Sequence, residues 1–435
     1  IQSDYATANL NGAFQYQILP TTIQQLMHTY LPSIVDKPAA DRSRNNNLDF
    51  YAYFRNLDTI IQVLDLGIEI PSFPTIKGFI REEDQHIGVQ AFIPNVNTKT
   101  IKMQDITVSL SNHNEHLDLS VFVFNQLPKN NPTAAKVGDI KSNLHLSVAH
   151  DELDLLVELG NTDKIRNEGV IRAISKLSKQ NDKPKFDIQV LPSNIILNDS
   201  AWHINRADIT YSAADKVMDI SNFALNTTYQ SITVDGRASE LATDSLNIVL
   251  ENINLDYILS YTEANKAISS LGLVTGNAQL YSLFSAPMLS AKAQIPNGGL
   301  NGVYLGDVSA EAVLDRENKS ILIDGVIVDS TKHTVAKVDG KVIPEKKWWG
   351  LDITCDSINI NFIDFWTNKI IANPQGKAYG RVKVEGEEKK VWVTGRALAK
   401  DAHITVPQIG VTFHLNDSIF LDSTEIHFPD VKIYD

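Results

Sequence analysis

The stretch LNIVLENINLDYILSYT at Leu246–Thr262 decides the fold, because a second copy of it follows. The second copy, LDITCDSININFIDFWT at Leu351–Thr367, begins 105 residues later and keeps the same order of apolar and polar residues. The offset is nearly maintained further on, where Gly306 in VYLGDVS precedes Gly410 in VPQIGVT by 104 residues. A unit repeated at this spacing indicates an architecture that grows by adding similar blocks.

A weaker copy of the same block lies upstream. The tract NLDTII at Asn56–Ile61 matches NLDYIL at Asn254–Leu259, and Gly78 matches Gly276 at the same offset of 198 residues. Small drifts in the offset are expected where loops of different length join the strands. Three copies of one loose block therefore account for much of the chain.

From about Leu48 onward, apolar residues recur at every second position over short segments. Polar tracts and turn signals such as NDS, DREN, EGEEK and AKDA separate these segments. Alternation of this kind predicts antiparallel strands with one apolar and one water-facing side. The clearest examples are Ile106/Val108/Leu110, Leu144/Leu146/Val148, Leu246/Ile248/Leu250, Val382/Val384, Val391/Val393 and Val411/Phe413/Leu415.

Two segments depart from this alternation. A short helix is predicted over Pro20–Ile34, with Pro32 limiting its end. Its apolar positions at helical spacing are Ile23, Leu26, Met27, Tyr30 and Leu31. The segment Asn161–Lys179 fits either a helix or a turn followed by strands, and the strand interpretation is favoured.

The number of strands restricts the architecture. Strands of about 8–12 residues would number on the order of 35, more than an ordinary open sheet or a small barrel contains. The remaining solution is a ribbon that grows along one axis and reaches roughly 150 Å. Its apolar face is either the core between two packed sheets or a trough that the protein's own side chains leave unfilled. Periodicity does not separate these two possibilities.

The composition is that of a soluble globular protein, with 43% hydrophobic and 21% charged residues among 435. A formal charge of −13 opposes phosphate backbones, so no nucleic-acid partner is expected. The single cysteine, Cys355, excludes an intrachain disulfide and a thiolate metal cluster. No apolar run of bilayer length and no secretion signal occurs, and the abrupt ends indicate a part of a longer protein.

No catalytic signature emerges from the sequence, which has no GxSxG elbow, HExxH motif or phosphate-binding glycine loop. His113 and His116 are close in sequence, but their spacing on one strand would put them on opposite faces, so no metal site is expected. The carboxylates of Asp151–Glu152 and Glu385–Glu388 are expected to be solvated turn residues, and Cys355 a buried structural thiol. The chain is therefore predicted to be no enzyme and to need no cofactor.

Five tracts follow one another in a characteristic order over Ser245–Asp435. They are SLNIVLENINLDYILSYT, GNAQLYSLFSAPMLSAKAQI, VYLGDVSAEAVLDRENKSILIDG, LDITCDSININFIDFWTNKIIANPQGKAYGRVKVEG and VTGRALAKDAHITVPQIGVTFHLNDSIFLDSTEIHF. In this order they resemble the TamB family (translocation and assembly module inner-membrane component), within the wider AsmA-like group. Upstream, FDIQVLPSNIILNDSAWHI at Phe186–Ile204 is similar to another tract of these proteins. The motifs are diffuse, so the resemblance rests on order and spacing.

The resemblance implies an all-β, elongated, repeating β-sheet ribbon folded into a taco- or trough-like groove, with one short N-terminal helix. It also implies a periplasmic location, between the two membranes of a diderm bacterium. A full-length member is anchored to the inner membrane by an N-terminal helix, which is expected outside this chain. Members are linked to phospholipid movement toward the outer membrane and, through a BamA-like outer-membrane partner, to assembly of β-barrel proteins.

The expected organisation has four parts. Residues 1–47 form a helical and loop segment, and residues 48–245 form a first β-trough block with intervening strands. Two further β-trough repeats cover residues 246–350 and 351–435.

The function predicted from this reasoning is a non-enzymatic conduit for phospholipids, with acyl chains in the groove and headgroups at its open edge. A scaffold for the assembly of outer-membrane β-barrel proteins is the alternative, and an envelope hydrolase is a third hypothesis. The residues predicted to line the lipid-binding groove are Ile358, Ile360, Phe362, Val382, Val384, Val391, Val393, Ile404, Val406, Val411 and Phe413.

Overall fold

The computed structural model describes residues 2–38, 46–55, 57, 61, 68–71, 73–97, 102–113, 115–126, 139–161, 165–254, 270–285, 287–300, 302–315, 317–343, 346–361, 372–387, 390–422 and 425–427. The chain forms two compact units. Unit 1 comprises Ile1–Thr227 with Asp235–Arg237, and unit 2 comprises Thr228–Val234 with Ala238–Asp435. The all-β prediction with one short N-terminal helix is confirmed, because all other long elements in the described parts are antiparallel strands.

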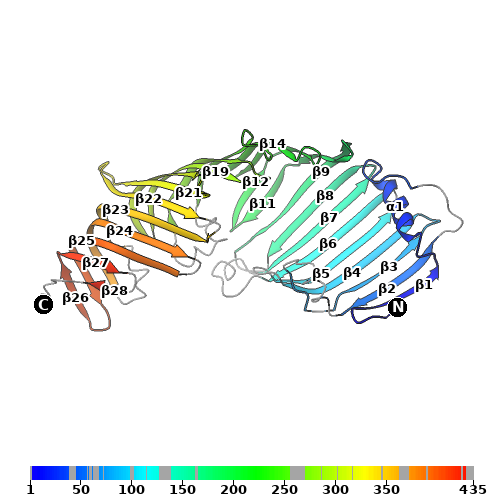
Figure 1. Ribbon diagram of the computed structural model, residues 1–435, viewed down its shortest axis with the longest axis horizontal. Helices are drawn as coiled ribbons and strands as arrows, with labels where there is room; N and C mark the ends of the chain where they lie inside the picture. The colour runs from blue at the N-terminus through cyan, green and yellow to red at the C-terminus, as the bar shows by residue number, and fades with distance from the viewer. Residues whose placement is uncertain are drawn as a thin grey trace. The chain divides into compact units, whose positions relative to one another are not determined.

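Unit 1 contains the helix and the first fourteen strands (Figure 1). Their bounds are β1 (Ala6–Ala13), α1 (Leu19–Tyr30), β2 (Asn47–Phe54), β3 (Thr75–Arg81), β4 (His86–Asn97), β5 (Lys102–His113), β6 (His116–Gln126), β7 (Ile140–Ala149), β8 (Glu152–Asn161), β9 (Glu168–Gln180), β10 (Lys183–Val190), β11 (Ser193–Leu197), β12 (Ser200–Ile204), β13 (Ala207–Ser212) and β14 (Val217–Asn226).

The strands of unit 1 follow one another in chain order. Each strand from β1 to β10 pairs antiparallel with the next. Beyond β9, pairs of shorter strands take the place of single long strands. β10 and β11 both pair with β9, then β13 with β10 and β12 with β11, and β14 with both β12 and β13. Unit 1 is therefore a single-layer antiparallel meander, and the strand interpretation of Asn161–Lys179 is confirmed by the end of β8 and by β9.

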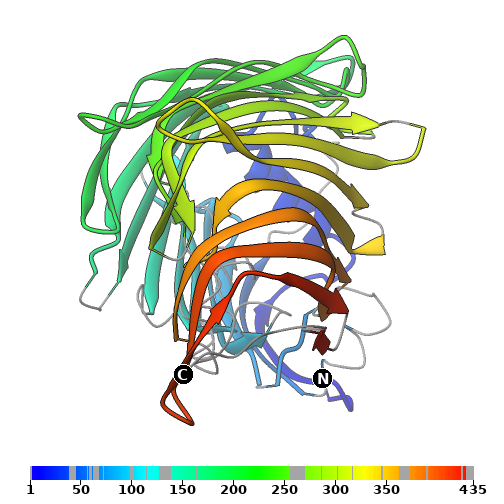
Figure 2. The ribbon, with the colours of Figure 1, turned by 90° about the vertical axis from the view of Figure 1, so that its left-hand side faces the viewer.

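Unit 2 repeats this plan. Its strands are β15 (Ser231–Ala238), whose residues are divided between the units, β16 (Ser245–Asn254), β17 (Ser270–Leu271), β18 (Leu273–Tyr281), β19 (Met288–Leu300), β20 (Val303–Asp315), β21 (Ser320–Val328), β22 (Thr334–Ile343), β23 (Trp348–Asn359), β24 (Ala372–Glu387), β25 (Lys390–Val406), β26 (Val411–Leu415), β27 (Ser418–Asp422) and β28 (Glu425–His427). From β18 to β25 each strand pairs with the next, and β16 pairs with β18. β25 then pairs with β26 through one half and with β27 through the other. In Figure 2 the strands drawn from yellow to red are arched along their length.

The two best copies of the repeat fold alike. They form β16 and β23, and each contains a β-bulge at the same place in the repeat. Asn252 (φ 53°) and Ser357 (φ 80°), which are 105 residues apart, have left-handed backbones at these bulges. The backbone N–H of Asn252 donates to Thr275 Oγ1 at 3.1 Å, so the bulge leaves it satisfied. A bulge bends a strand, so the repeat preserves a bend as well as an apolar pattern.

The offset match between Gly306 and Gly410 does not relate equivalent positions. Gly306 lies inside β20, whereas Gly410 (φ +66°) ends the turn between β25 and β26. The topological counterpart of Gly410 is Gly302 (φ +83°), in the turn between β19 and β20. Both turn glycines have a left-handed backbone that side chains with a Cβ rarely adopt.

The tract AKDA was expected to be a turn, and this expectation is wrong. It lies within β25, where Asp401 (φ 49°) forms a bulge and its backbone N–H donates to Asn416 Oδ1 at 2.8 Å. A bulge and a turn both favour small polar residues, which explains the error. Among the 28 described strands, β24 and β25, with 16 and 17 residues, clearly exceed the expected length of about 8–12 residues.

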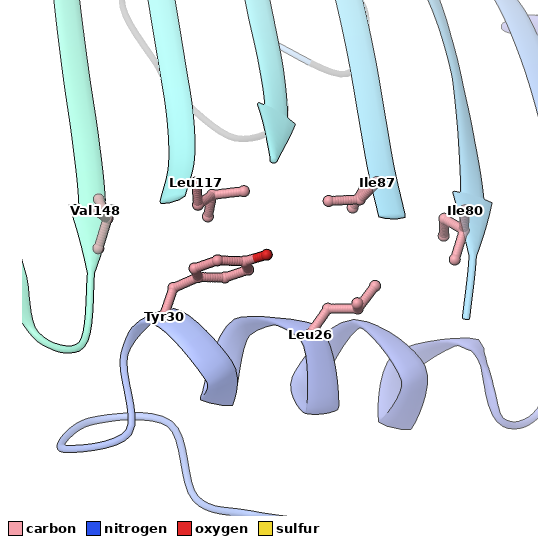
Figure 3. Packing of buried hydrophobic residues seen from close by; sticks show 6 residues of the cluster. All are labelled: Leu26, Tyr30, Ile80, Ile87, Leu117 and Val148. Atoms are coloured by element: carbon pink, nitrogen blue, oxygen red, sulfur yellow. The ribbon is translucent and has the colours of Figure 1, made fainter. Parts of the chain in front are cut away.

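Helix α1 packs against the ends of the unit 1 strands (Figure 3). Leu26 and Tyr30 form a buried cluster with Ile80, Ile87, Leu117 and Val148. The predicted helix is confirmed, and it ends at Tyr30, just before Pro32. Ile23 was expected on its apolar face but is 43% exposed, because Thr22 takes the buried position instead.

Polar side chains fix both ends of α1. Near its start, Thr22 Oγ1 donates to Glu82 Oε2 at 2.9 Å, and Asn46 Nδ2 donates to Thr22 Oγ1 at 2.7 Å. Beyond its end, the carboxylate of Asp151 accepts hydrogen bonds from the Ser33 backbone N–H (3.0 Å) and hydroxyl (2.7 Å). The expectation of a solvated Asp151 is therefore wrong, since this side chain is 8% exposed. No helix among the described residues is long and apolar enough to cross a membrane.

Candidate functional site

One face of the unit 2 sheet is apolar across neighbouring strands from β16 to β25. The pairing register aligns side chains into rows that run across the strands, and directly opposed residues share a face. One row consists of Ile248, Ala278, Ala291, Ala312, Ile323, Gly340, Leu351, Val384 and Val393. The adjacent row consists of Leu250, Gly276, Ala293, Ala310, Gly325, Val338, Ile353, Val382 and Gly395. Neither row contains a polar side chain. We call this surface the apolar face of unit 2.

The opposite face of the same strands is polar. Its central row, read in the same register, consists of Val249, Asn277, Lys292, Glu311, Asp324, Asp339, Asp352, Lys383 and Thr394. The four carboxylates stand next to one another, and cations lie at both ends. Lys292 Nζ is 2.8 Å from Glu311 Oε1, and Arg381 Nε is 3.3 Å from Asp352 Oδ1. Neighbouring like charges are tolerable here because this face is open to water.

The apolar face is accessible, but its side chains are less exposed than similar side chains on the polar face. The exposed fractions of valine and leucine side chains can be compared between the two faces. Val313 and Leu322 on the polar face are 50% and 45% exposed, whereas Val384 and Leu351 on the apolar face are half-buried. The apolar face is thus partly shielded without being covered by a second layer of described strands.

Unit 1 has the same division of its two faces. One row across it consists of Phe50, Gly78, Val89, Leu110, Leu119, Leu146, Leu155, Ala173, Val190 and Ala207. The row on the other face consists of Lys77, Gln90, Ser109, Ser120, His145, Leu156 and Arg172. We call the first surface the apolar face of unit 1. Helix α1 packs on one margin of it through Leu26 and Tyr30.

Three of the predicted groove residues lie in the open part of the apolar face of unit 2. Val384 is directly opposite Val393, and Val382 is opposite Gly395. All three valines are half-buried. They are therefore within reach of a bound molecule.

Three others are core residues at the bend of the sheet. Ile358 is 6% exposed and packs with Leu305 and Ala336. Ile360 and Ile404 are 8% and 7% exposed and share a second cluster. They occupy the same face as the valines, but surrounding side chains cover them, so their main role is packing.

The remaining predicted residues lie near the end of unit 2 or outside the described part of the structure. Ile404 pairs with Phe413, and Val406 with Val411, across β25 and β26, which brings these residues onto the same face. Val406, Val411 and Phe413 are half-buried. Val391 is paired with Gly386, but its side chain lies outside the described part of the structure, as does the whole of Phe362.

The small residues of the apolar rows were missed from the sequence. Ala278, Ala291 and Ala312 stand side by side in one row. Only large apolar residues were considered, yet alanine and glycine leave room above the sheet for another molecule. The available signal was their strict alternation with polar residues such as Asn277 and Lys292.

The two histidines also behave differently from expectation. His113 ends β5 and His116 begins β6, and they are directly paired across the hairpin, so they lie on one face and not on opposite faces. The expectation treated them as members of one strand and overlooked the turn. Among the described residues no group of His, Cys, Asp or Glu is arranged to hold a metal ion.

Two shallow depressions lie on the polar side of unit 1. Their volumes are about 510 and 500 Å³. The first is lined by Asp49, Lys77 and Gln90, and the second by Asp154 and Lys176, among others. Both are open and charged, with no grouping that supports catalysis, so they are less informative than the apolar faces.

The reactivity of the Cys355 thiol can be used to test how far the apolar face is shielded from water. It is a free, half-buried thiol in β23, opposite Ala336, and burial raises the pKa of this thiol. A raised pKa leaves less reactive thiolate at neutral pH. We therefore expect iodoacetamide to alkylate Cys355 several-fold more slowly at pH 7.5 than a thiol at Leu322→Cys, introduced on the polar face of a Cys355→Ser variant. The rate at Cys355 should still rise at pH values where the control has levelled off. Equal rates and pH profiles would contradict this description.

No family model matches the chain, and neither a curated protein nor a solved structure matches it. The two units present wide apolar surfaces whose central rows have no hydrogen-bonding side chains, and such surfaces can hold hydrocarbon by the hydrophobic effect. The polar residues lie on the opposite face of each sheet, so each sheet has one water-facing side and one side suited to an apolar ligand.

Proposed function

We propose that this chain is a non-enzymatic carrier of phospholipids, which bind by their acyl chains along the apolar face of each unit. The observation that supports the proposal is the composition of the apolar rows of unit 2. Eighteen directly paired positions, in two rows across nine strands, are all glycine, alanine, valine, leucine or isoleucine. Monomeric soluble proteins rarely leave so wide an apolar surface without a ligand or partner.

The absence of polar groups from these rows favours an acyl chain over a polypeptide. An extended polypeptide brings backbone N–H and C=O groups that need partners when water is removed. The face of a sheet offers only side chains, and the side chains in these two rows neither donate nor accept hydrogen bonds. An acyl chain makes no such demand and gains about 0.8 kcal/mol for each CH₂ group buried.

The dimensions are compatible with this occupant. Nine neighbouring strands extend about 38 Å across the sheet, from a strand spacing of about 4.8 Å. One acyl chain spans about 15 Å, half of the hydrocarbon thickness of a bilayer. Several lipids could therefore lie side by side on one unit.

The proposed setting comes from the resemblance to the TamB family. In that setting the chain is periplasmic, is anchored to the inner membrane by a segment of the full-length protein, and works with a BamA-like outer-membrane partner. The alternative, a scaffold for assembly of β-barrel proteins, would use the same surface for unfolded barrel segments. One experiment can separate the two ligands.

The experiment uses a photocrosslinking amino acid at two neighbouring positions. Val393 faces the apolar side and Thr394 the polar side of β25. With benzoylphenylalanine at Val393, illumination in the envelope of a diderm bacterium should give phospholipid adducts, detected by mass spectrometry. The same residue at Thr394 should give few.

Each alternative outcome has a definite meaning. Adducts with barrel-protein peptides at Val393 would favour the scaffold. Lipid adducts of equal yield at both positions would show that the apolar face is not the binding surface, and no adducts at Val393 would refute the carrier.

A further inference from the structure

One row of side chains, on the face of unit 1 opposite its apolar face, alternates between aromatic residues and residues with a hydroxyl or amide group. Read across β1 to β7 in the pairing register, the row consists of Thr7, Tyr53, Thr75, Phe92, Thr107, Phe122 and Asn143. These strands lie side by side in chain order (Figure 1). We call this row the aromatic row.

The rings of the aromatic row are accessible to solvent. Phe92 is 41% exposed and Phe122 is 36% exposed. On β2 the half-buried ring of Tyr53 lies 5.5 Å, between centroids, from the ring of Phe73, which is 54% exposed. A large apolar side chain that stays in water contributes little to folding, and several such side chains in one place indicate a binding surface.

The side chains between the rings can form hydrogen bonds with a ligand. The hydroxyl groups of Thr75 and Thr107 have no hydrogen-bond partner among the described residues. Asn143 donates from its side-chain amide to Glu158 Oε2 at 3.0 Å, which leaves its amide oxygen as an acceptor. None of the side chains of the aromatic row is charged. A complementary ligand is therefore neutral along its length and presents both apolar surfaces and hydroxyl groups.

The charged side chains that flank the aromatic row are of both signs. Lys77 is exposed beside the row on β3, and the Arg55 guanidinium lies 5.5 Å from the centroid of the Tyr53 ring. Lys141 and Glu158 are exposed at the β7 end of the row. Since neither sign dominates, attraction to a charged surface does not account for the aligned rings.

The rings recur on every second strand. Two strand spacings amount to about 9.6 Å, so Tyr53, Phe92 and Phe122 together span about 19 Å across the sheet. This spacing matches the distance between alternate rings of a linear β-1,4-linked glycan, in which neighbouring sugar rings are turned over and alternate rings present the same face. The negative face of an aromatic ring attracts the C–H groups of a sugar ring. An extended polypeptide fits less well, because its side chains on one side recur at about 6.8 Å.

We propose that the aromatic row binds a neutral, linear β-1,4-linked glycan that runs across β2 to β7. Alternate sugar rings stack on Tyr53, Phe92 and Phe122, and the rings between them form hydrogen bonds through their hydroxyl groups with Thr75 and Thr107. This inference does not rest on the proposed function, because the glycan and the acyl chains use opposite faces of the sheet. Unit 1 could thus be held on a polysaccharide while its apolar face stays free.

Isothermal titration of the full chain with N-acetylchitohexaose tests this site. The parent chain should bind the hexasaccharide, and Phe92→Thr and Phe122→Thr, which each remove one stacking ring, should each raise the Kd about tenfold. The matched control is Phe79→Thr. Phe79 is a phenylalanine of similar exposure (37%) on the same face, but it lies four residues along β3 from Thr75 and outside the aromatic row, so its replacement should leave the Kd unchanged.

The linkage is tested with maltohexaose, whose α-1,4 linkages curve the chain away from a straight row, so it should bind much more weakly than N-acetylchitohexaose. No binding of N-acetylchitohexaose by the parent chain would overturn the inference, and equal effects of Phe79→Thr and Phe92→Thr would overturn the location of the site. Equal binding of the two hexasaccharides would show that the ring spacing does not select the ligand. Failure to bind either sugar, together with attachment to phospholipid vesicles that Phe92→Thr abolishes, would assign the row to a membrane surface instead. Circular dichroism verifies that each variant is folded.

Discussion

Replacement of Val384 by aspartate is expected to lower phospholipid transfer between vesicles by at least about tenfold, because a desolvated carboxylate costs several kcal/mol and 1.4 kcal/mol already corresponds to tenfold. Val384 stands between Leu351 and Val393 in an uninterrupted apolar row. An acyl chain passing this row would have to strip water from the new carboxylate. The half-buried position leaves the carboxylate hydrated while no lipid is bound, so folding should be little affected.

The matched control is Leu322→Asp on the polar face. Leu322 is as apolar as Val384, but it is 45% exposed and lies opposite Lys341, which can pair with the new carboxylate. We expect transfer by Leu322→Asp to remain within about twofold of the parent, because the substitution lies off the apolar face and exposed surface substitutions change stability by only about 0.5 kcal/mol. Transfer is measured with a fluorescent phospholipid moving between donor and acceptor vesicles. A folded Val384→Asp protein that transfers lipid as fast as the parent would refute the role of this row.

Replacement of Asp151 by alanine is expected to lower the free energy of unfolding of unit 1 by about 3 kcal/mol, since it leaves buried donors without an acceptor. The Ser33 N–H and hydroxyl both donate to this carboxylate, at 3.0 and 2.7 Å. Asp151 also has a left-handed backbone (φ 68°), which aspartate tolerates better than alanine. Loss of these contacts should release the end of α1 first.

The control for Asp151 is its neighbour Glu152, which is the first residue of β8 and has an exposed side chain. Glu152→Ala should change the free energy of unfolding by no more than about 0.5 kcal/mol. Urea unfolding followed by circular dichroism gives the stability, and hydrogen exchange over Leu19–Tyr30 reports α1 locally. Equal stabilities of the two variants, with unchanged exchange in α1, would show that Asp151 does not hold the helix.

The faces of the sheet could be predicted from the sequence because a strand has a period of two. Val382, Val384 and Val393 were chosen from alternation alone, and the register places them on one face. The positions of the β-bulges could not be predicted from this alternation. Without the bulge at Ser357, the register would turn Ile358 to the polar side, and only the folded backbone shows the extra residue.

Contacts between segments far apart in the chain could not be predicted from the sequence either. Nothing near Asp151 in the sequence shows that Ser33, 118 residues earlier, covers it. A turn carboxylate is usually solvated, so the prediction failed for a reason that lies elsewhere in the chain. The sequence also could not decide between a trough and a core between two sheets. Alternation shows which side of a strand is apolar, but it does not show whether a second sheet covers that side. In the described parts of each unit, strands lie in a single layer.

The pairing of nearly every strand with its neighbour in the sequence has a consequence for synthesis. A hairpin of this protein can close as soon as its second strand emerges, because it does not wait for a distant partner. Local pairing of this kind shortens the loops that must be closed during folding and favours rapid, stepwise zippering. A growing chain would then expose only its newest strand edge at any moment, and an extra hairpin could be inserted without reversing the direction or the facing of any later strand.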